Sequence, residues 1–211
     1  HREGLIIGSA CEAGEIFQAI LREKEETELA RLVSFYDYLE IQPIGNNSFM
    51  LRSDKYAAET EEDLRQYNKR VVELGEHYNK PVVATCDVHF LDPEDEIYRR
   101  IIMAGKGFKD ADDQPPVYLR TTEEMLEEFK YLGSEKAKEV VITNTQLINE
   151  QIEKISPVLP YKCPPEIPDS DATLTQICYD KAHEIYGPEL HPVGVERLER
   201  ELNSIISNGF A

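Results

Sequence analysis

A strand–helix–strand order in the first half of the chain constrains the fold most strongly. Residues 59–78 carry apolar side chains at helical spacing, among them Leu64 and Leu74, and predict a helix with one buried face. This helix leads directly into residues 81–91, a Val- and Thr-rich stretch between prolines that predicts one buried strand. Because residues 36–44 predict an earlier strand, we expect two parallel strands joined by a helix, and hence an α/β layer or barrel.

Further elements are expected on both sides of this unit. Residues 4–10 form a short apolar strand candidate, and residues 13–31 favour one charged helix. Asp92 can cap a helix whose first position is Pro93, and Thr121 opens a capping-box pattern for another helix. Strands and helices thus alternate in the first half of the chain, whereas helices predominate in the second half.

The second half contains the best candidate for a domain boundary. Residues 134–155 favour a helix, although the β-branched residues 140–143 leave a strand open. The proline-rich segment 156–168 has almost no periodicity and therefore predicts a linker. Two amphipathic helices are expected after it, in residues 169–211. The chain would then consist of an α/β domain over residues 1–155, the linker and a helical segment.

Composition argues against several classes of function. The chain has 23 Lys and Arg against 41 Asp and Glu, and its formal net charge of -18 would repel nucleic-acid phosphates. A free-standing nucleic-acid binder is therefore not expected. One basic cluster contains Arg99, Arg100, Lys106 and Lys109. Its acidic neighbours favour a salt-bridged face, and a contact with nucleic acid or another domain is the alternative.

Cysteine spacing and hydropathy indicate the compartment. The four cysteines, Cys11, Cys86, Cys163 and Cys178, lie far apart and form no C-x-x-C pair. Neither a disulfide framework nor a zinc ribbon is predicted, and a reducing cytoplasm fits best. No apolar run approaches the ~20 residues that cross a bilayer, and no signal peptide is recognisable. We expect a soluble, cytoplasmic protein without a membrane partner.

Asp87 and His89 form the first candidate site. Residues two apart on a strand point the same way, so a strand over residues 81–91 would place both side chains on one face. A carboxylate and an imidazole side by side can bind one divalent metal ion or act as an acid/base pair. The alternative is that Asp87 bonds a neighbouring backbone group and that His89 is an ordinary interior histidine.

Cys11 is the second candidate. It follows the first strand candidate and lies between Gly8 and Gly14, which permit a tight turn. A thiolate is a strong zinc ligand and α/β barrels place ligands at strand ends, although a buried, unreactive cysteine is the alternative. Together with the Asp/His pair, Cys11 suggests ligation by Cys, His and carboxylate. Glu12 and Glu15 could support such a site or simply start a helix.

Long stretches of the sequence resemble one bacterial family. The second half of the polymerase and histidinol phosphatase (PHP) domain in the PolC-type DNA polymerase III alpha subunit is similar to "HREGLIIGSACEAGEIF", "KPVVATCDVHFLDPEDEIYRRII" and "YLRTTEEMLEEFKYLG". The segment that leads into the palm domain of the same enzyme is similar to "PPEIPDSDATLTQICYDKAHEIYG" and "VERLERELNSIISNGFA". The resemblance covers essentially the whole chain, and the long phrases agree in order.

The resemblance implies a fold and a domain order. Residues 1–155 would be the C-terminal half of a PHP domain, part of a distorted (β/α)7 barrel, and residues 156–168 a linker. Residues 169–211 would be a mostly helical lead-in to the palm. His1 falls where the family's inserted exonuclease ends, and the apolar end at Ala211 is typical of a cut chain. The remaining PHP ligands and the palm aspartates are therefore expected outside this segment.

The resemblance also implies a function. Cys11, Asp87 and His89 match members of the family's PHP metal cluster, which would hold zinc or manganese. The full protein would be a replicative DNA-directed DNA polymerase, a nucleotidyltransferase that uses magnesium and carries a 3'-5' exonuclease. Its partners would be primer-template DNA, a sliding clamp and the remainder of its own chain. This segment alone is expected to be inactive.

Two other functions stay open. The first is a stand-alone PHP-type metal-dependent phosphoesterase, against which the missing ligand strands argue. The second is a non-catalytic structural or docking module, whose acidic helices would bind other subunits.

Overall fold

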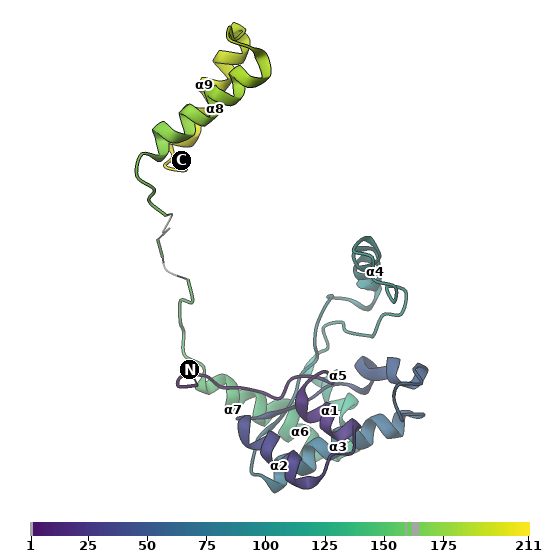
Figure 1. Ribbon diagram of the computed structural model, residues 1–211. Helices are drawn as coiled ribbons and strands as arrows, with labels where there is room; N and C mark the ends of the chain where they lie inside the picture. Colours follow the sequence, from purple (N-terminus) through teal and green to yellow (C-terminus); the bar gives the residue numbers. More distant parts are fainter. Residues whose placement is uncertain (1, 159, 162–164) are drawn as a thin grey trace. The chain divides into compact units, whose positions relative to one another are not determined.

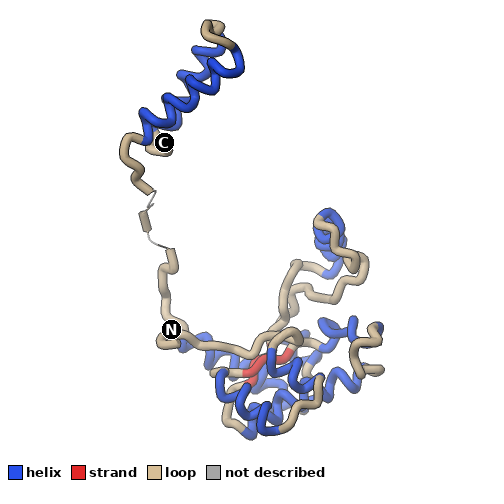
Figure 2. The backbone as a smooth tube through the Cα atoms, viewed as in Figure 1, coloured by secondary structure: helices blue, strands red, loops and turns tan. Residues whose placement is uncertain are grey.

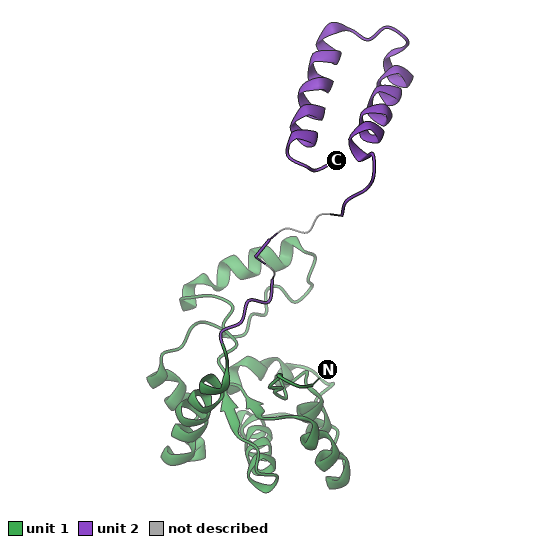
Figure 3. Cartoon of the chain, turned by 90° about the vertical axis from the view of Figure 1, so that its left-hand side faces the viewer, with its two compact units in different colours: residues 1–153 green, residues 154–211 purple. Residues whose placement is uncertain are grey.

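The computed structural model describes residues 2–158, 160–161 and 165–211. Cys163 therefore lies outside the described residues. The chain forms two compact units, His1–Glu153 and Lys154–Ala211 (Figure 3). The expected linker, residues 156–168, belongs to the second unit and includes positions 159 and 162–164, which are not described.

A parallel sheet of two strands lies in unit 1 (Figure 2). The strands are β1 (Leu39–Ile41) and β2 (Val82–Ala84). The register pairs Leu39 with Val82, Glu40 with Val83 and Ile41 with Ala84. The predicted parallel pairing across a connecting helix is thus confirmed. The strand candidate over residues 4–10 pairs only through Gly8, which forms a parallel bridge with Tyr38.

Both named strands are shorter than predicted because the backbone turns away. Within the expected strand over residues 81–91, β2 ends at Ala84, Asp87 has a left-handed φ of 57°, and pairing resumes only as an isolated bridge between Phe90 and Tyr118. An extended strand cannot continue through such a residue. The expected strand over residues 36–44 gives way to the 3-10 helical segment η1 (Ile44–Arg52). The prediction of long strands over residues 36–44 and 81–91 is therefore wrong.

The single helix predicted over residues 13–31 is in fact two helices. They are α1 (Glu15–Leu21) and α2 (Glu26–Phe35). Glu23 lies between them with a left-handed φ of 50°, which ends the first helix. The two helices contact each other, so the break folds the charged stretch back on itself.

Helix α3 (Glu61–His77) connects the two strands in the sequence. A capping box starts it: the Thr60 N–H donates to the Asp63 carboxylate at 2.8 Å, and the Asp63 N–H donates to the Thr60 hydroxyl at 3.3 Å. Leu64 and Leu74 are buried on the face predicted for them. This face contacts both strands, so α3 covers the sheet.

Short, mostly helical elements follow β2. They are η2 (Pro93–Asp95), α4 (Glu96–Gly105), α5 (Thr122–Glu128), η3 (Lys130–Leu132), α6 (Ser134–Lys138), the π-helical η4 (Glu139–Thr143) and α7 (Asn144–Gln151). The predicted capping box at Thr121 is present, because its N–H donates to the Glu124 carboxylate at 2.7 Å. Residues 140–143 are helical, so the strand left open there is excluded.

The core of unit 1 lies between the sheet and its surrounding helices (Figure 1). Its largest fully buried side chains are those of Phe129, Ile16, Leu39, Ile41, Met50 and Leu74. η4 and α7 contact β2, and the Asn144 Nδ2 donates to the Val82 carbonyl at 2.8 Å. The flanking helices therefore hold the two strands in place. They thereby also position the segments that follow the strands in the chain.

Unit 2 is a helical hairpin. It consists of α8 (Ser170–Tyr186) and α9 (Pro192–Ser207), the two helices predicted after the linker (Figure 3). Leu202 of α9 is buried, and the Tyr179 hydroxyl of α8 donates to the Glu199 carboxylate at 3.4 Å. Most other apolar side chains of this unit are exposed.

The described residues together form a mixed α/β fold with few strands, which agrees with the predicted class. The PHP barrel implied by the resemblance remains a prediction. Within the described ranges, no helix combines the length and the apolar character needed to cross a membrane.

Candidate functional site

A cleft of about 510 Å³ lies where the segments after the two strands meet. Gln42 and Asn46 follow β1 in the chain, Asp87 and His89 follow β2, and all four line the cleft. Glu12 lines it from the segment before α1. Parallel strands direct their carboxyl ends to the same edge of a sheet, so groups distant in the sequence converge there.

Asp87 and His89 lie side by side at this cleft, although a turn and not a strand brings them together. The His89 N–H donates to the Val117 carbonyl at 2.8 Å, which anchors the segment after β2. The His89 Nδ1 lies 2.8 Å from the Asp87 carbonyl oxygen and 3.8 Å from the Asp87 Oδ1. The prediction that a strand face aligns them is wrong, but their side chains are neighbours.

The ring contact of His89 assigns a role to each nitrogen. A carbonyl oxygen only accepts hydrogen bonds, so this contact places a proton on Nδ1, and in the neutral ring Nε2 carries the lone pair. The side chains of His89 and Asp87 are 42% and 43% exposed, so His89 is not an interior histidine. One imidazole nitrogen and one carboxylate are therefore accessible for a metal ion or for proton transfer.

Cys11 lies in the turn between the N-terminal bridge and α1. Its carbonyl accepts from the Gly14 N–H at 2.9 Å, and a Cβ on Gly14 would lie 2.1 Å from the Ser9 carbonyl oxygen. The tight turn expected here is thus present, and the backbone approaches Gly14 closely. The thiol is free and partly buried. Burial raises the pKa of Cys11, and the neighbouring Glu12 carboxylate raises it further.

The described part of the chain contains no group of three His, Cys, Asp or Glu side chains close enough to hold one metal ion. Asp87 and His89 offer two neighbouring ligand atoms, whereas Cys11 is not among the residues that line the cleft. A zinc site uses about three or four protein ligands. The pair therefore fits a metal site only if further ligands join it, and the predicted site with Cys11 stays a prediction.

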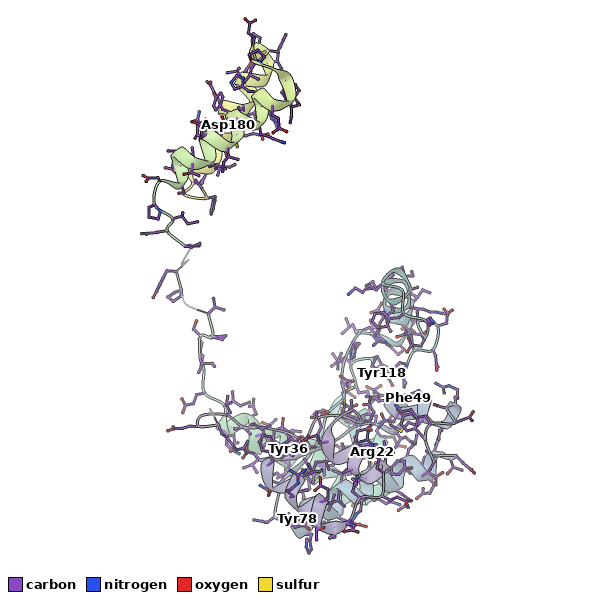
Figure 4. The ribbon with its side chains drawn as sticks, viewed as in Figure 1. Arg22, Tyr36, Phe49, Tyr78, Tyr118 and Asp180 are labelled. Carbon is purple, nitrogen blue, oxygen red and sulfur yellow. The ribbon has the colours of Figure 1, made fainter. Side chains whose placement is uncertain are left out.

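The two acidic residues beside Cys11 have different surroundings. The Glu15 Oε2 accepts a hydrogen bond from the Tyr36 hydroxyl at 3.0 Å (Tyr36 is labelled in Figure 4). Glu15 thus ties the first turn of α1 to the segment after α2. Glu12 lines the cleft together with Asp87 and His89, so of these two glutamates it is the one placed to support a site there.

Asn46 is a cleft residue that the sequence does not single out. Its Nδ2 donates to the Cys86 carbonyl at 3.1 Å and to the Gln42 Oε1 at 3.5 Å. Its Oδ1 is buried and, among the residues described, has no hydrogen-bond partner. Such atoms are uncommon in folded proteins. The Gly-Asn-Asn run after β1 predicts only a turn, so its contribution to the cleft is not visible in the sequence.

The basic cluster on and after α4 is only partly salt-bridged. The Arg100 Nε pairs with Asp112 at 3.0 Å, as a salt-bridged face requires. Arg99 instead bonds the neutral side chain of Gln114. Within the described ranges, Lys106 takes part in no ion pair. Positive charge therefore remains available beside the cleft, whose lining includes Arg99.

Comparison with curated proteins identifies similar sequences over the whole chain. The chain is 54% identical over 211 residues to "DNA polymerase III PolC-type" of Clostridium perfringens. It is 56% identical over 210 residues to the protein of the same name from Caldanaerobacter subterraneus, and 42% identical over 214 residues to that of Bacillus subtilis. No protein-family model matches the chain.

The relatives are much longer than this chain. All of the chain is covered in each alignment, but the aligned part is 14% of the Clostridium protein and 15% of the other two. The chain thus spans about one seventh of the length of the curated relatives it matches. Both units lie within the aligned part.

Proposed function

We infer that this chain is a segment of a PolC-type DNA polymerase III, the group of proteins that it matches from end to end. Identities of 38–56% over all of its residues carry this inference. The resemblance to PolC-type DNA polymerase III is thereby confirmed, whereas the position of the segment within a PHP domain stays a proposal. The parent protein is accordingly a replicative DNA-directed DNA polymerase.

The activity proposed for the parent is extension of a primer with deoxynucleotides. Magnesium ions held by carboxylates would stabilise the negative charge that develops in this phosphoryl transfer. Those carboxylates would come from parts of the parent outside this segment. Primer-template DNA, a sliding clamp and the remaining polymerase chain would be its partners, in the cytoplasm. The net charge of -18 indicates that the DNA is held elsewhere.

Within the parent, residues 1–155 would contribute the second half of a PHP barrel. The parallel pairing of β1 and β2, and the further parallel bridge from Gly8, support this proposal. So does the cleft beyond their carboxyl ends, since α/β barrels place functional groups there. Residues 169–211 would form the helical lead-in to the palm.

The same proposal gives Asp87, His89 and Cys11 a shared task, the binding of zinc or manganese with ligands from other parts of the parent. His89 would bind through Nε2 while the Asp87 carbonyl holds the ring through Nδ1. The Asp87 carboxylate, next to the ring, would supply an oxygen ligand. A bound divalent ion would stabilise charge on a phosphate oxygen or acidify a water molecule.

Primer extension tests the proposed function. The parent polymerase, purified with this segment in place, should extend a primed template in the presence of magnesium. The 211-residue chain alone should incorporate no nucleotide under the same conditions, because the residues for two-metal catalysis would lie outside it. Incorporation by the isolated chain, or none by the parent, would contradict the proposal.

A phosphatase assay distinguishes the two alternative functions, a stand-alone phosphoesterase and a non-catalytic docking module. Hydrolysis of a phosphate monoester by the isolated chain with added zinc or manganese would support a stand-alone phosphoesterase. We expect no hydrolysis, because the described residues do not assemble a complete ligand set.

A further inference from the structure

Helix α4 carries an exposed apolar face. None of its side chains is buried, and Ile97, Tyr98, Ile101 and Ile102 are between 44% and 63% exposed. Positions 97 and 101, and positions 98 and 102, are each one helical turn apart and lie on the same side of the helix. A helix normally buries such a stripe, so this face lacks a partner among the described residues of unit 1.

The other side of α4 is already in use. The Arg100 Nε pairs with Asp112 at 3.0 Å, and the Gln114 Nε2 contacts the Met103 sulfur at 3.3 Å. Arg99 donates to the same Gln114 side chain. These contacts attach the polar side of α4 to the loop that follows it. The apolar face of α4 is therefore the side that these contacts with the loop leave exposed.

A groove of about 570 Å³ borders one edge of this face, the edge of Tyr98 and Ile102 and not that of Ile97 and Ile101. Tyr98 and Ile102 line it, together with Leu91 and Phe108 from the flanking segments, which are also largely exposed. His89 lines both this groove and the cleft beyond the two strands. Whatever fills the groove would lie next to the Asp87–His89 pair.

We propose that this α4 face, made of Leu91, Ile97, Tyr98, Ile101, Ile102 and Phe108, packs against an apolar surface of the parent polymerase chain outside this segment. The proposal rests on the proposed function. In the aligned relatives, about six sevenths of the chain lies outside the matched part. A parent of similar length would therefore have enough polypeptide to cover the α4 face.

Charge favours this occupant over the alternatives. A second copy of the chain would bring two net charges of -18 together, which repel each other. Nucleic acid would need phosphate ligands, whereas the face consists of large apolar side chains. Arg99 and Lys106 line the groove against one carboxylate, that of Asp95, and Lys106 has no ion pair in the described part of the chain. The surface that covers the groove should therefore carry carboxylates around its apolar centre.

Hydrogen exchange of the α4 backbone tests the proposal. In the isolated chain the amides of residues 98–106 should exchange rapidly, because no packed face protects them. In the parent polymerase without DNA, the same amides should exchange at least tenfold more slowly. The double substitution Ile101→Gln with Ile102→Gln in the parent should abolish most of this protection.

Arg31→Gln serves as the control, because Arg31 is an exposed side chain on α2, and it should leave the protection of α4 unchanged. Equal, rapid exchange in the parent and the isolated chain would overturn the proposal. Protection that requires primer-template DNA would overturn it in favour of nucleic acid. Protection of the isolated chain that grows with its concentration would overturn it in favour of a second copy. A parent that extends primers yet leaves α4 unprotected would reject the docking alone and leave the proposed function intact.

Discussion

The His89 Nδ1 lies 2.8 Å from the carbonyl oxygen of Asp87, two residues earlier in the chain. This contact holds the imidazole ring and leaves Nε2 free to bind a metal ion. The carboxylate of the same Asp87 lies 3.8 Å from the ring. A single short turn thus presents a nitrogen ligand and an oxygen ligand together.

Replacing His89 by Ala should reduce zinc binding by the 211-residue chain at least about tenfold, because it removes one of few available ligands. Equilibrium dialysis against zinc measures this change. The thermal midpoint should stay the same, since the His89 side chain is exposed.

His183→Ala is the matched control for zinc binding. The His183 Nδ1 makes a similar contact with the Gly187 carbonyl at 3.1 Å, and the described residues give it no carboxylate at ion-pair distance. An equal loss of zinc binding in His89→Ala and His183→Ala would contradict the prediction that the Asp87–His89 pair binds zinc preferentially.

Gly14→Ala should lower the thermal stability of the chain. A Cβ at this position would lie 2.1 Å from the Ser9 carbonyl oxygen, which is backbone and cannot move aside cheaply. We expect a loss of about 1–3 kcal/mol, as for other overpacked sites. Gly105→Ala on α4 is the control, because nothing lies within 4 Å of its added Cβ. Thermal unfolding followed by circular dichroism should separate the two variants, and equal midpoints would contradict the close packing of the Cys11 turn.

Tyr131 should make the stability of unit 1 sensitive to alkaline pH. Burial raises the pKa of its hydroxyl from 10.0 to about 12. The folded state therefore favours the neutral phenol, whose contribution is complete below pH 10 and is lost as the pH rises through 12. The hydroxyl also accepts a hydrogen bond from the Asn68 Nδ2 at 2.9 Å.

Substituting Phe for Tyr131 should remove this dependence. Between about pH 9 and pH 12, the free energy of unfolding should fall by about 2–3 kcal/mol more in the original chain than in Tyr131→Phe. Urea unfolding at several pH values measures the difference. Tyr186→Phe, at an exposed tyrosine of α8, should follow the original chain. If the free energy of unfolding fell equally with pH in the original chain and in Tyr131→Phe, the raised pKa of Tyr131 would be refuted.

The sequence predicts the order of elements better than their ends. The helix between β1 and β2 follows from its apolar periodicity, and the parallel pairing follows from that helix. The end of β2 depends instead on the left-handed backbone of Asp87 and on the bond from the His89 N–H to the Val117 carbonyl. The second of these is a tertiary contact, which local propensity cannot reveal. The break at Glu23 likewise lacks the glycine that usually marks such a turn.

The candidate site is visible in the sequence only in part. Two-residue spacing brings Asp87 and His89 together in a turn as it would in a strand, so their proximity is predictable. Asn46 is not, because its place at the cleft depends on the pairing of β1 with β2 and on its bond to the Cys86 carbonyl. The position of Cys11 relative to the pair depends on the fold around the cleft, which no local pattern determines.

Anomalous X-ray diffraction from crystals of the parent polymerase tests the proposed metal site most directly. Data collected at the zinc edge, and again at the manganese edge, locate the bound ion independently of any assumed ligand. We predict one peak with the Cys11 sulfur, an Asp87 carboxylate oxygen and the His89 Nε2 all at about 2.0–2.3 Å. A bound ion elsewhere in the parent, with these three side chains outside its coordination shell, would contradict this prediction.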